Sequence, residues 1–112
     1  MKTLFQCYIK PVWILNTMIP FELMRLGEIY ISEQYNTSSH ICLCGRKDCG
    51  MQVVLPFNKT DHVNPNFWDL VKEKNGTISI IGSVGNFQFP CKSHYIITKN
   101  VANFLSITPI NP

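Results

Sequence analysis

Short runs in which apolar and polar residues alternate predict a chain built mainly of β-strands. Residues 28–33 alternate cleanly, with Ile29 and Ile31 on one face, as in a strand that is buried on one side. Residues 51–55 and 77–81 are β-branched runs bounded by Pro or Gly, a pattern that is also typical of strands. Each run has the length and composition of one strand, which favours a sheet-based fold.

The two ends of the chain repeat this pattern less regularly. Residues 4–15 are rich in β-branched and aromatic side chains and predict one or two strands divided at Pro11. Three more strands are expected towards the C-terminus, at residues 87–89, 94–98 and 101–107.

The segments between the strands predict little regular structure. Residues 19–24 carry Pro20 near the start and predict a single helical turn. Residues 35–39 are expected to be a polar connection, and residues 82–86 a glycine-rich turn.

Segment 67–73 fits two predictions equally well on propensity alone. It fits a short helix with Asn64 as N-cap, Pro65 in the first turn and Gly76 just past the end. It fits equally a strand, with Asn75 and Gly76 forming a type I′ hairpin turn into the next strand.

These elements predict a mostly β fold, a small antiparallel sheet or open barrel with at most one or two short helical turns. Residues 1–112 are expected to form a single domain, with an N-terminal strand region at residues 1–18 and a loose tail at residues 108–112. The expected core consists of Ile29, Ile31, Val53, Leu55, Ile78, Ile80 and Ile96. A chain of 112 residues buries only about two thirds of its unfolded surface, so a metal ion would add useful stability.

Composition and charge exclude several classes of protein. The chain is 46% hydrophobic and 15% charged, as expected of a globular protein. Its net charge is +3 and its Lys and Arg residues are scattered, so no nucleic-acid partner is expected. The longest apolar region, residues 9–19, is broken by Lys10 and Pro11, whereas a membrane span needs about 20 apolar residues.

The cysteines indicate metal binding rather than disulfides. The chain has five, an odd number, and Cys42, Cys44 and Cys49 lie close together in the sequence. This crowding favours a metal site, and with it a reducing, cytoplasmic compartment. Cys7 lies alone in an apolar strand and is interpreted as a small core residue.

Two separated clusters are predicted to supply the ligands for one zinc ion. The first carries the three crowded cysteines, with Gly45 and Gly50 allowing the tight turns of a metal-binding knuckle. The second, about forty residues later, offers a thiolate and an imidazole. The five candidates for four tetrahedral positions are Cys42, Cys44, Cys49, Cys91 and His94, and which four bind is left open. His40 is expected to hydrogen-bond a ligand sulfur or to cap the loop.

The same residues favour a structural zinc over a catalytic one. An open catalytic site needs three protein ligands, a water and a nearby general base. The residue two positions after His40 is a cysteine, not the Glu of the zinc deaminases. Ser83, between two glycines, lacks the strand–turn–helix context of a nucleophile elbow and is interpreted as part of a turn. A cysteine nucleophile, Cys91 beside His40 or His94, and a redox protein remain alternatives.

The motifs resemble those of a bacterial family regarded as zinc-binding. Its core reads roughly His-x-Cys-x-Cys-Gly-Cys-Gly, followed by Pro-Ser-Ile-Gly-Asn-Trp-x-x-Pro-Cys-x-Ser-His-Tyr. The counterparts in this chain are His40-x-Cys42-x-Cys44-Gly45, Cys49-Gly50 and the segment 82–95. The resemblance covers residues 19–98, and it implies a strand at 67–73.

This chain departs from the family pattern in three places. Arg46-Lys47-Asp48 is inserted between the second and third cysteines, where it forms either an exposed contact tip or a longer turn. Phe87 replaces a Trp, and Gly82 replaces a Pro.

The resemblance also implies a cellular context, because some members are encoded beside bacterial ubiquitin-like conjugation components. We therefore expect a zinc-stabilised adaptor or accessory binding module, with a ubiquitin-like protein or a conjugation enzyme as partner. The alternative is a small metal-dependent or cysteine-nucleophile hydrolase that acts on peptide or isopeptide bonds.

Overall fold

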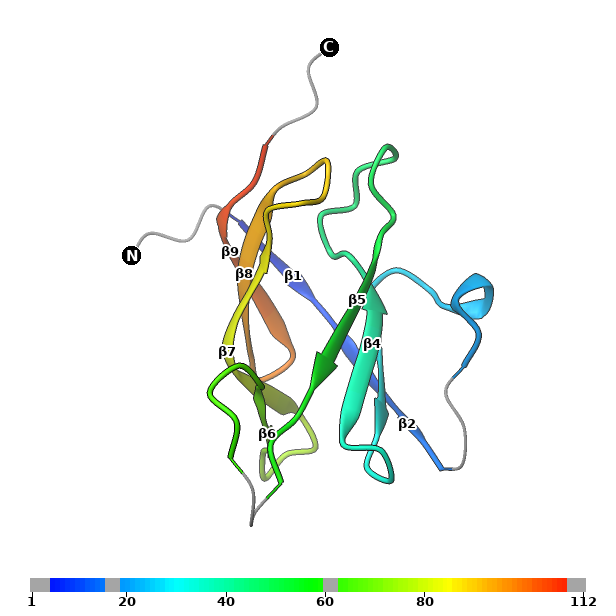
Figure 1. Cartoon of the computed structure of the whole chain (residues 1–112), viewed down its shortest axis with the longest axis vertical. Helices are drawn as coiled ribbons and strands as arrows, with labels where there is room; N and C mark the ends of the chain where they lie inside the picture. The colour runs from blue at the N-terminus through cyan, green and yellow to red at the C-terminus, as the bar shows by residue number, and fades with distance from the viewer. Residues whose placement is uncertain (1–4, 16–18, 60–62, 109–112) are drawn as a thin grey trace.

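The computed structural model describes residues 5–15, 19–59 and 63–108, and over these ranges the chain forms two β-sheets (Figure 1). The first sheet has the order β1-β9-β8-β7-β6, and its strands are β1 (Phe5–Tyr8), β6 (Asp69–Lys72), β7 (Ile78–Asn86), β8 (Ser93–Thr98) and β9 (Val101–Ser106). The second has the order β2-β3-β4-β5, and its strands are β2 (Lys10–Ile14), β3 (Glu28–Ser32), β4 (Thr37–Ile41) and β5 (Gln52–Pro56). Neighbouring strands are antiparallel except β2 and β3, which are parallel. The predicted mostly β, open architecture is confirmed.

The N-terminal segment joins the two sheets. β1 pairs with β9 in one sheet and β2 pairs with β3 in the other. The crossing point is the buried Ile9, whose N–H donates to the carbonyl of Asn100 at 2.9 Å. The predicted division at Pro11 is therefore displaced. Pro11 lies inside β2, the outer strand of its sheet, where a missing N–H is tolerated.

Two other predictions agree with the structure. The helical turn is the short 3₁₀ segment η1 (Phe21–Leu23), and segment 67–73 contains strand β6 rather than a helix. No helix among the described residues is long and apolar enough to cross a membrane. The predicted loose tail lies outside the described residues except for Thr108, whose N–H donates to the carbonyl of Cys91 at 2.7 Å.

The expected polar connection at residues 35–39 is wrong, because most of it belongs to β4. Ser38, Ser39 and His40 are buried in that strand although they are polar. Gln52 Nε2 donates to Ser39 Oγ at 2.8 Å, and His40 Nε2 lies 2.8 Å from the hydroxyl of Tyr95. These partners lie far along the chain, so the local polar pattern could not predict a buried strand.

The expected turn at residues 82–86 and strand at 87–89 are also wrong, because β7 continues through the glycines to Asn86. The pairing of β7 with β8 shifts register between Ile80 and Val84, so the strand is irregular there rather than ended. Gly82 adopts φ +113°, and a Cβ at this position would lie 2.8 Å from the Trp68 ring. Glycine therefore accommodates the bulge and the close packing of Trp68.

The core lies between the sheets. Six of the seven predicted core residues are buried, but Ile96 is only half-buried. The alternation along β8 instead turns Ser93, Tyr95 and Ile97 inward. Tyr95 and Phe104 are the largest fully buried side chains, and Cys42 and Cys91 belong to the same buried cluster. The core thus continues directly into the cysteine cluster.

Candidate metal centre

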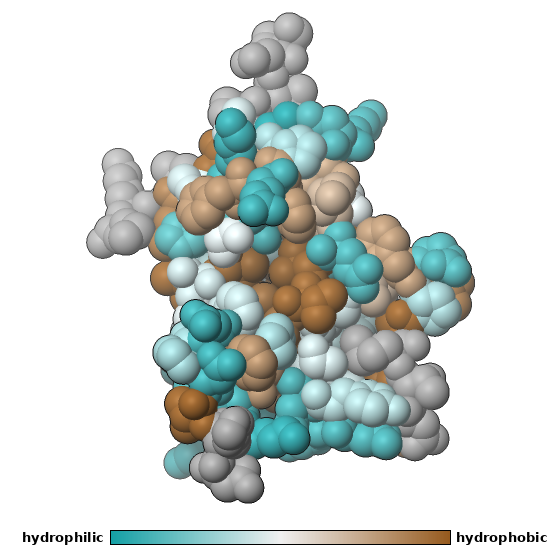
Figure 2. Space-filling view, viewed as in Figure 1, coloured by the Kyte–Doolittle hydropathy of each residue, from teal (hydrophilic) through white to brown (hydrophobic). Residues whose placement is uncertain are grey.

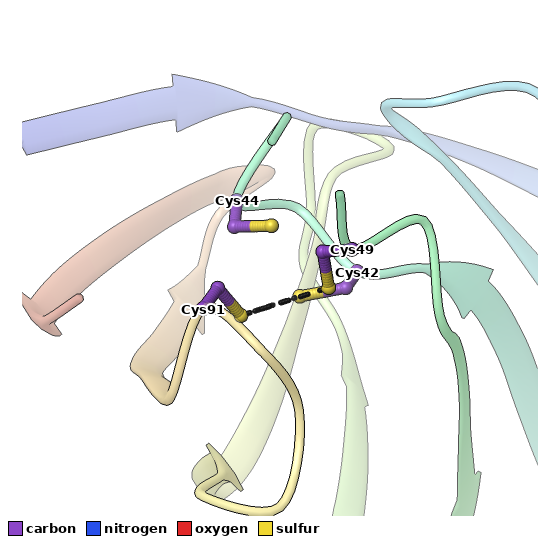
Figure 3. A group of neighbouring side chains, drawn as sticks. All are labelled: Cys42, Cys44, Cys49 and Cys91. Carbon is purple, nitrogen blue, oxygen red and sulfur yellow. Dashed lines mark hydrogen bonds between the residues drawn. The ribbon is translucent and has the colours of Figure 1, made fainter. Parts of the chain in front are cut away.

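Four cysteines gather where the two sheets meet (Figure 3). Cys42, Cys44 and Cys49 lie on the loop that follows β4, and Cys91 lies on the turn that precedes β8. Their Sγ atoms all lie within 4.8 Å of one another. The two segments, far apart in the sequence, meet as predicted, and each connects strands of a different sheet.

The sulfur geometry fits a tetrahedral metal ion. Cys91 Sγ lies 3.6 Å from Cys42 Sγ and 3.7 Å from Cys49 Sγ. Four sulfurs at the usual Zn–S bond length of about 2.3 Å would lie about 3.8 Å apart in a regular tetrahedron. Four thiolates suit Zn²⁺ and leave no coordination position for water. When bound, such an ion cross-links the two sheets.

The local backbone is arranged for these sulfurs. Gly45 and Gly50 both adopt positive φ, +70° and +56°, as expected for residues that turn the chain directly after a ligand cysteine. The N–H of Arg46 donates to Cys44 Sγ at 3.4 Å. The two glycines therefore allow the tight turns of the predicted knuckle, and the turn after Cys44 directs the Arg46 N–H to the Cys44 sulfur.

Neither histidine of the two clusters reaches the sulfurs. His94 is half-buried on β8, and its ring packs against Phe87 with a centroid distance of 5.6 Å. His40 does not bond a sulfur as expected, since its Nε2 pairs with Tyr95 and its buried Nδ1 has no hydrogen-bond partner among the described residues. Burial lowers the pKa of His40 to about 3, so this imidazole is neutral.

The sulfurs are supported by two polar residues that the sequence analysis did not identify, Ser93 and Asn86. Ser93 Oγ lies 3.3 Å from Cys91 Sγ and 3.5 Å from Cys42 Sγ, and Asn86 Nδ2 donates to Cys42 Sγ at 3.6 Å. Both are buried. Both also lie inside the segment 82–95 that resembles the family motif, and this position in the motif is the only feature of the sequence that points to them.

The thiols differ in acidity. Burial raises the pKa of Cys42 to about 11, and it also raises the pKa of Cys44. Burial acts in the same direction on Cys91, but hydrogen bonds from Ser93, Cys42 and Cys44 together outweigh it and lower the pKa of Cys91. A metal ion must displace the protons of Cys42 and Cys44 to bind there.

The inserted residues 46–48 hold the knuckle against the other cysteine segment. The guanidinium of Arg46 pairs with the carboxylate of Asp48 and donates to the carbonyls of Pro90 and Thr108. The Arg46 side chain is only 12% exposed. Arg46 therefore ties the knuckle to the other cysteine segment, while Lys47 and Asp48 of the insertion are exposed.

Removing the Asn86 amide tests its support of the metal centre. Asn86→Ala is expected to weaken zinc binding about 10–100-fold, because a hydrogen bond to a ligand sulfur is lost. Competition with a chromogenic chelator measures this affinity. Asn103→Ala is the matched control, since Asn103 pairs with Gln6 on the surface of β9. Equal zinc affinity in the two variants would contradict the assigned role.

A second group of polar side chains lies on the opposite face of β7, β8 and β9. Ser83 is exposed, whereas its neighbours Val84 and Asn86 point into the protein. Gly85 pairs with His94 across β7 and β8, and His94 pairs with Ser106 across β8 and β9. Ser83 is thus the diagonal cross-strand neighbour of His94. A Cβ on Gly85 would lie 2.7 Å from the Phe87 ring, so glycine is needed here because that ring fills the space above it.

The comparisons with known proteins identify the family. No curated protein and no solved structure matches the chain. One family of sequences, described as "Bacterial ubiquitination-like system serine protease (BubE)", matches residues 15–105, most of the chain. This agrees with the expected link to ubiquitin-like conjugation. The chain, with its four-cysteine centre, belongs to the BubE family.

Proposed function

We propose that the chain is a serine-type hydrolase that cleaves peptide or isopeptide bonds in a bacterial ubiquitination-like system. The description of its family as a serine protease supports this proposal. The observation that carries it in this chain is an exposed serine hydroxyl, that of Ser83, diagonal to the His94 imidazole across β7 and β8.

In this proposal Ser83 Oγ attacks the carbonyl of the scissile bond, and His94 takes its proton as general base. The C–N bond then breaks as His94 passes that proton to the leaving amine, and water hydrolyses the acyl ester on Ser83. His94 is half-buried, and the Phe87 ring packs beside it over Gly85, so this ring has to turn aside before the imidazole extends towards Ser83. A Ser–His hydrogen bond often tightens only when substrate binds, so the diagonal arrangement is compatible with this role.

The metal has a structural role in this proposal. A zinc ion held by Cys42, Cys44, Cys49 and Cys91 has a complete set of protein ligands and no position for a reacting water. The metal-hydrolase alternative is less favoured for that reason. A cysteine nucleophile is less favoured too, because Cys91 lies inside the cluster and away from the surface. A reducing cytoplasm would keep the four thiols available to the ion.

A fluorophosphonate probe tests the proposal, because it labels activated serine hydroxyls. The purified chain is expected to cleave a ubiquitin-like protein that carries a C-terminal extension. It is also expected to react with the probe at Ser83, as located by peptide mass spectrometry. Cleavage that resists the probe but stops with a thiol-alkylating reagent would favour the cysteine nucleophile. No cleavage and no labelled serine would refute the hydrolase.

The second candidate is the adaptor expected from the sequence, a module that binds a ubiquitin-like protein or a conjugation enzyme without chemistry of its own. It is supported by exposed hydrophobic side chains, among them Val54, Phe87 and Met51, that a protein partner could cover. Tight binding of the ubiquitin-like protein without any cleavage would favour this candidate.

A further inference from the structure

A groove runs between β5 and the C-terminal half of β7. It is lined by residues of both strands and of the flanking loops, among them Gln52, Val54, Trp68, Gly85, Asn86 and Phe89. Its volume is about 180 Å³, below the roughly 300–1,000 Å³ of pockets for compact small molecules. Hydrophobic side chains gather at the centre of this face, over β5 (Figure 2). The groove is therefore too small to enclose a compact ligand, and what it offers to an extended chain lies in its rims.

Both rims of the groove are strand edges without a partner among the described residues. β5 pairs with β4 alone and is the outer strand of its sheet. β6 pairs with β7 only over Ile78–Ile81, so no strand covers the same edge of β7 from Ser83 to Asn86, although the Trp68 indole donates to the Ser83 carbonyl there. An unpaired edge presents a row of N–H and C=O groups that another extended chain can use.

The two sheets are joined at one end of the groove. The N–H of Asn58 donates to the carbonyl of Trp68 at 2.8 Å, and the N–H of Trp68 donates to that of Pro56 at 3.0 Å. β6 begins here and continues away from the groove. β6 thus lies beside the first half of β7. A chain in the groove would lie beside the second half of β7, along the same edge.

The backbone of β7 faces the groove at the required positions. Trp68 Nε1 donates to the carbonyl of Ser83 at 3.0 Å, so this carbonyl points to the edge that β6 and the groove share. In a strand, residues two apart direct their N–H and C=O groups to the same side. The N–H and C=O of Gly85 therefore point into the groove, next to the Ser83 side chain.

We infer that the groove binds an extended, uncharged peptide segment as an added strand between β5 and β7. All the residues that line it are uncharged, which disfavours a charged occupant. This inference rests on the proposed function, which makes the occupant the C-terminal segment of a ubiquitin-like protein. Pairing with Gly85 would then lay the scissile bond beside Ser83. Strand addition of this kind takes its affinity from main-chain hydrogen bonds.

A labelled peptide tests the groove separately from catalysis. The probe is a fluorescent peptide of about ten residues that matches the C-terminus of the ubiquitin-like protein from the same host. It is titrated against Ser83→Ala, so that no turnover occurs. Adding Val54→Arg, which places a charge in the groove, is expected to weaken binding at least about tenfold. Val71→Arg is the matched control, because Val71 is an exposed strand valine of β6 that does not line the groove.

Hydrogen exchange locates the bound peptide. Amides of β5 and of residues 83–86 are expected to gain protection, and N-methylation of alternate peptide amides is expected to abolish binding. Absent binding, binding equal in the Val54→Arg and Val71→Arg variants, or protection elsewhere would overturn the inference. Cleavage by the wild type that Val54→Arg leaves unchanged would refute the groove but not the hydrolase. Binding in the groove without cleavage by the wild type would refute the hydrolase but not the groove.

Discussion

Replacing Ser83 by alanine is expected to lower the rate of cleavage at least about 10³-fold, which is the largest effect expected of a single change. The hydroxyl would be the attacking group, and no water takes its place in a covalent mechanism. Because Ser83 is exposed and its side chain makes no hydrogen bond among the described residues, the variant should keep its fold. Single-turnover cleavage of the extended ubiquitin-like substrate measures the loss.

Ser106→Ala is the informative comparison. Ser106 lies directly opposite His94 on β9, so it is the other serine from which this imidazole could take a proton. We expect its replacement to leave most of the activity. A large loss in Ser106→Ala together with full activity in Ser83→Ala would contradict the assignment. Full activity in both variants would contradict a serine mechanism at this site.

Replacing Cys91 by serine is expected to have the largest effect on stability. Cys91 is fully buried and is the one cysteine of the cluster that comes from the β7–β8 connection. Its loss removes the link that a metal forms between the two sheets. Structural zinc contributes of the order of 10 kcal/mol in small metal-dependent domains, so we expect a loss of at least about 3 kcal/mol. At about 4–8 °C per kcal/mol, the melting temperature should fall by at least about 12 °C.

The measurements are metal content and thermal unfolding, with Cys7→Ser as the matched control. Cys7 is half-buried in β1 and does not belong to the four-sulfur group. Its replacement should leave the metal bound and lower the melting temperature only slightly. A Cys91→Ser protein that keeps one zinc per chain and melts with the wild type would contradict the structural role of the metal.

The sequence predicts the cysteine cluster better than the strands that hold it. Thiolates and turn glycines carry their chemistry locally, so Cys42 and Gly45 could be identified from spacing alone. His40 could not be placed in the same way, because its partner Tyr95 is 55 positions away and only the fold brings them together. Ser93 and Asn86 could not be assigned to the sulfurs either, because only the fold brings them to Cys42.

Strand limits were hardest to predict where polar or glycine residues are buried. β4 hides Ser38 and Ser39 in the interior, against the usual preference of polar residues for loops. β7 passes through Gly82 as a bulge, although glycine more often ends a strand. For the same reason the sequence around Ser83 is typical of a turn, whereas the pairing of β7 with β8 places this residue at an exposed position on a continuous strand near His94.

X-ray absorption spectroscopy of the purified, zinc-loaded protein tests most directly the central claim that the metal centre is closed and structural. We expect four sulfur ligands at about 2.3 Å and no nitrogen or oxygen in the first coordination shell. That result would assign the metal to Cys42, Cys44, Cys49 and Cys91 and leave His94 free to act with Ser83. Three sulfurs with one imidazole nitrogen would instead place His94 on the metal, and a bound water would reopen metal hydrolysis. Either result would contradict the account.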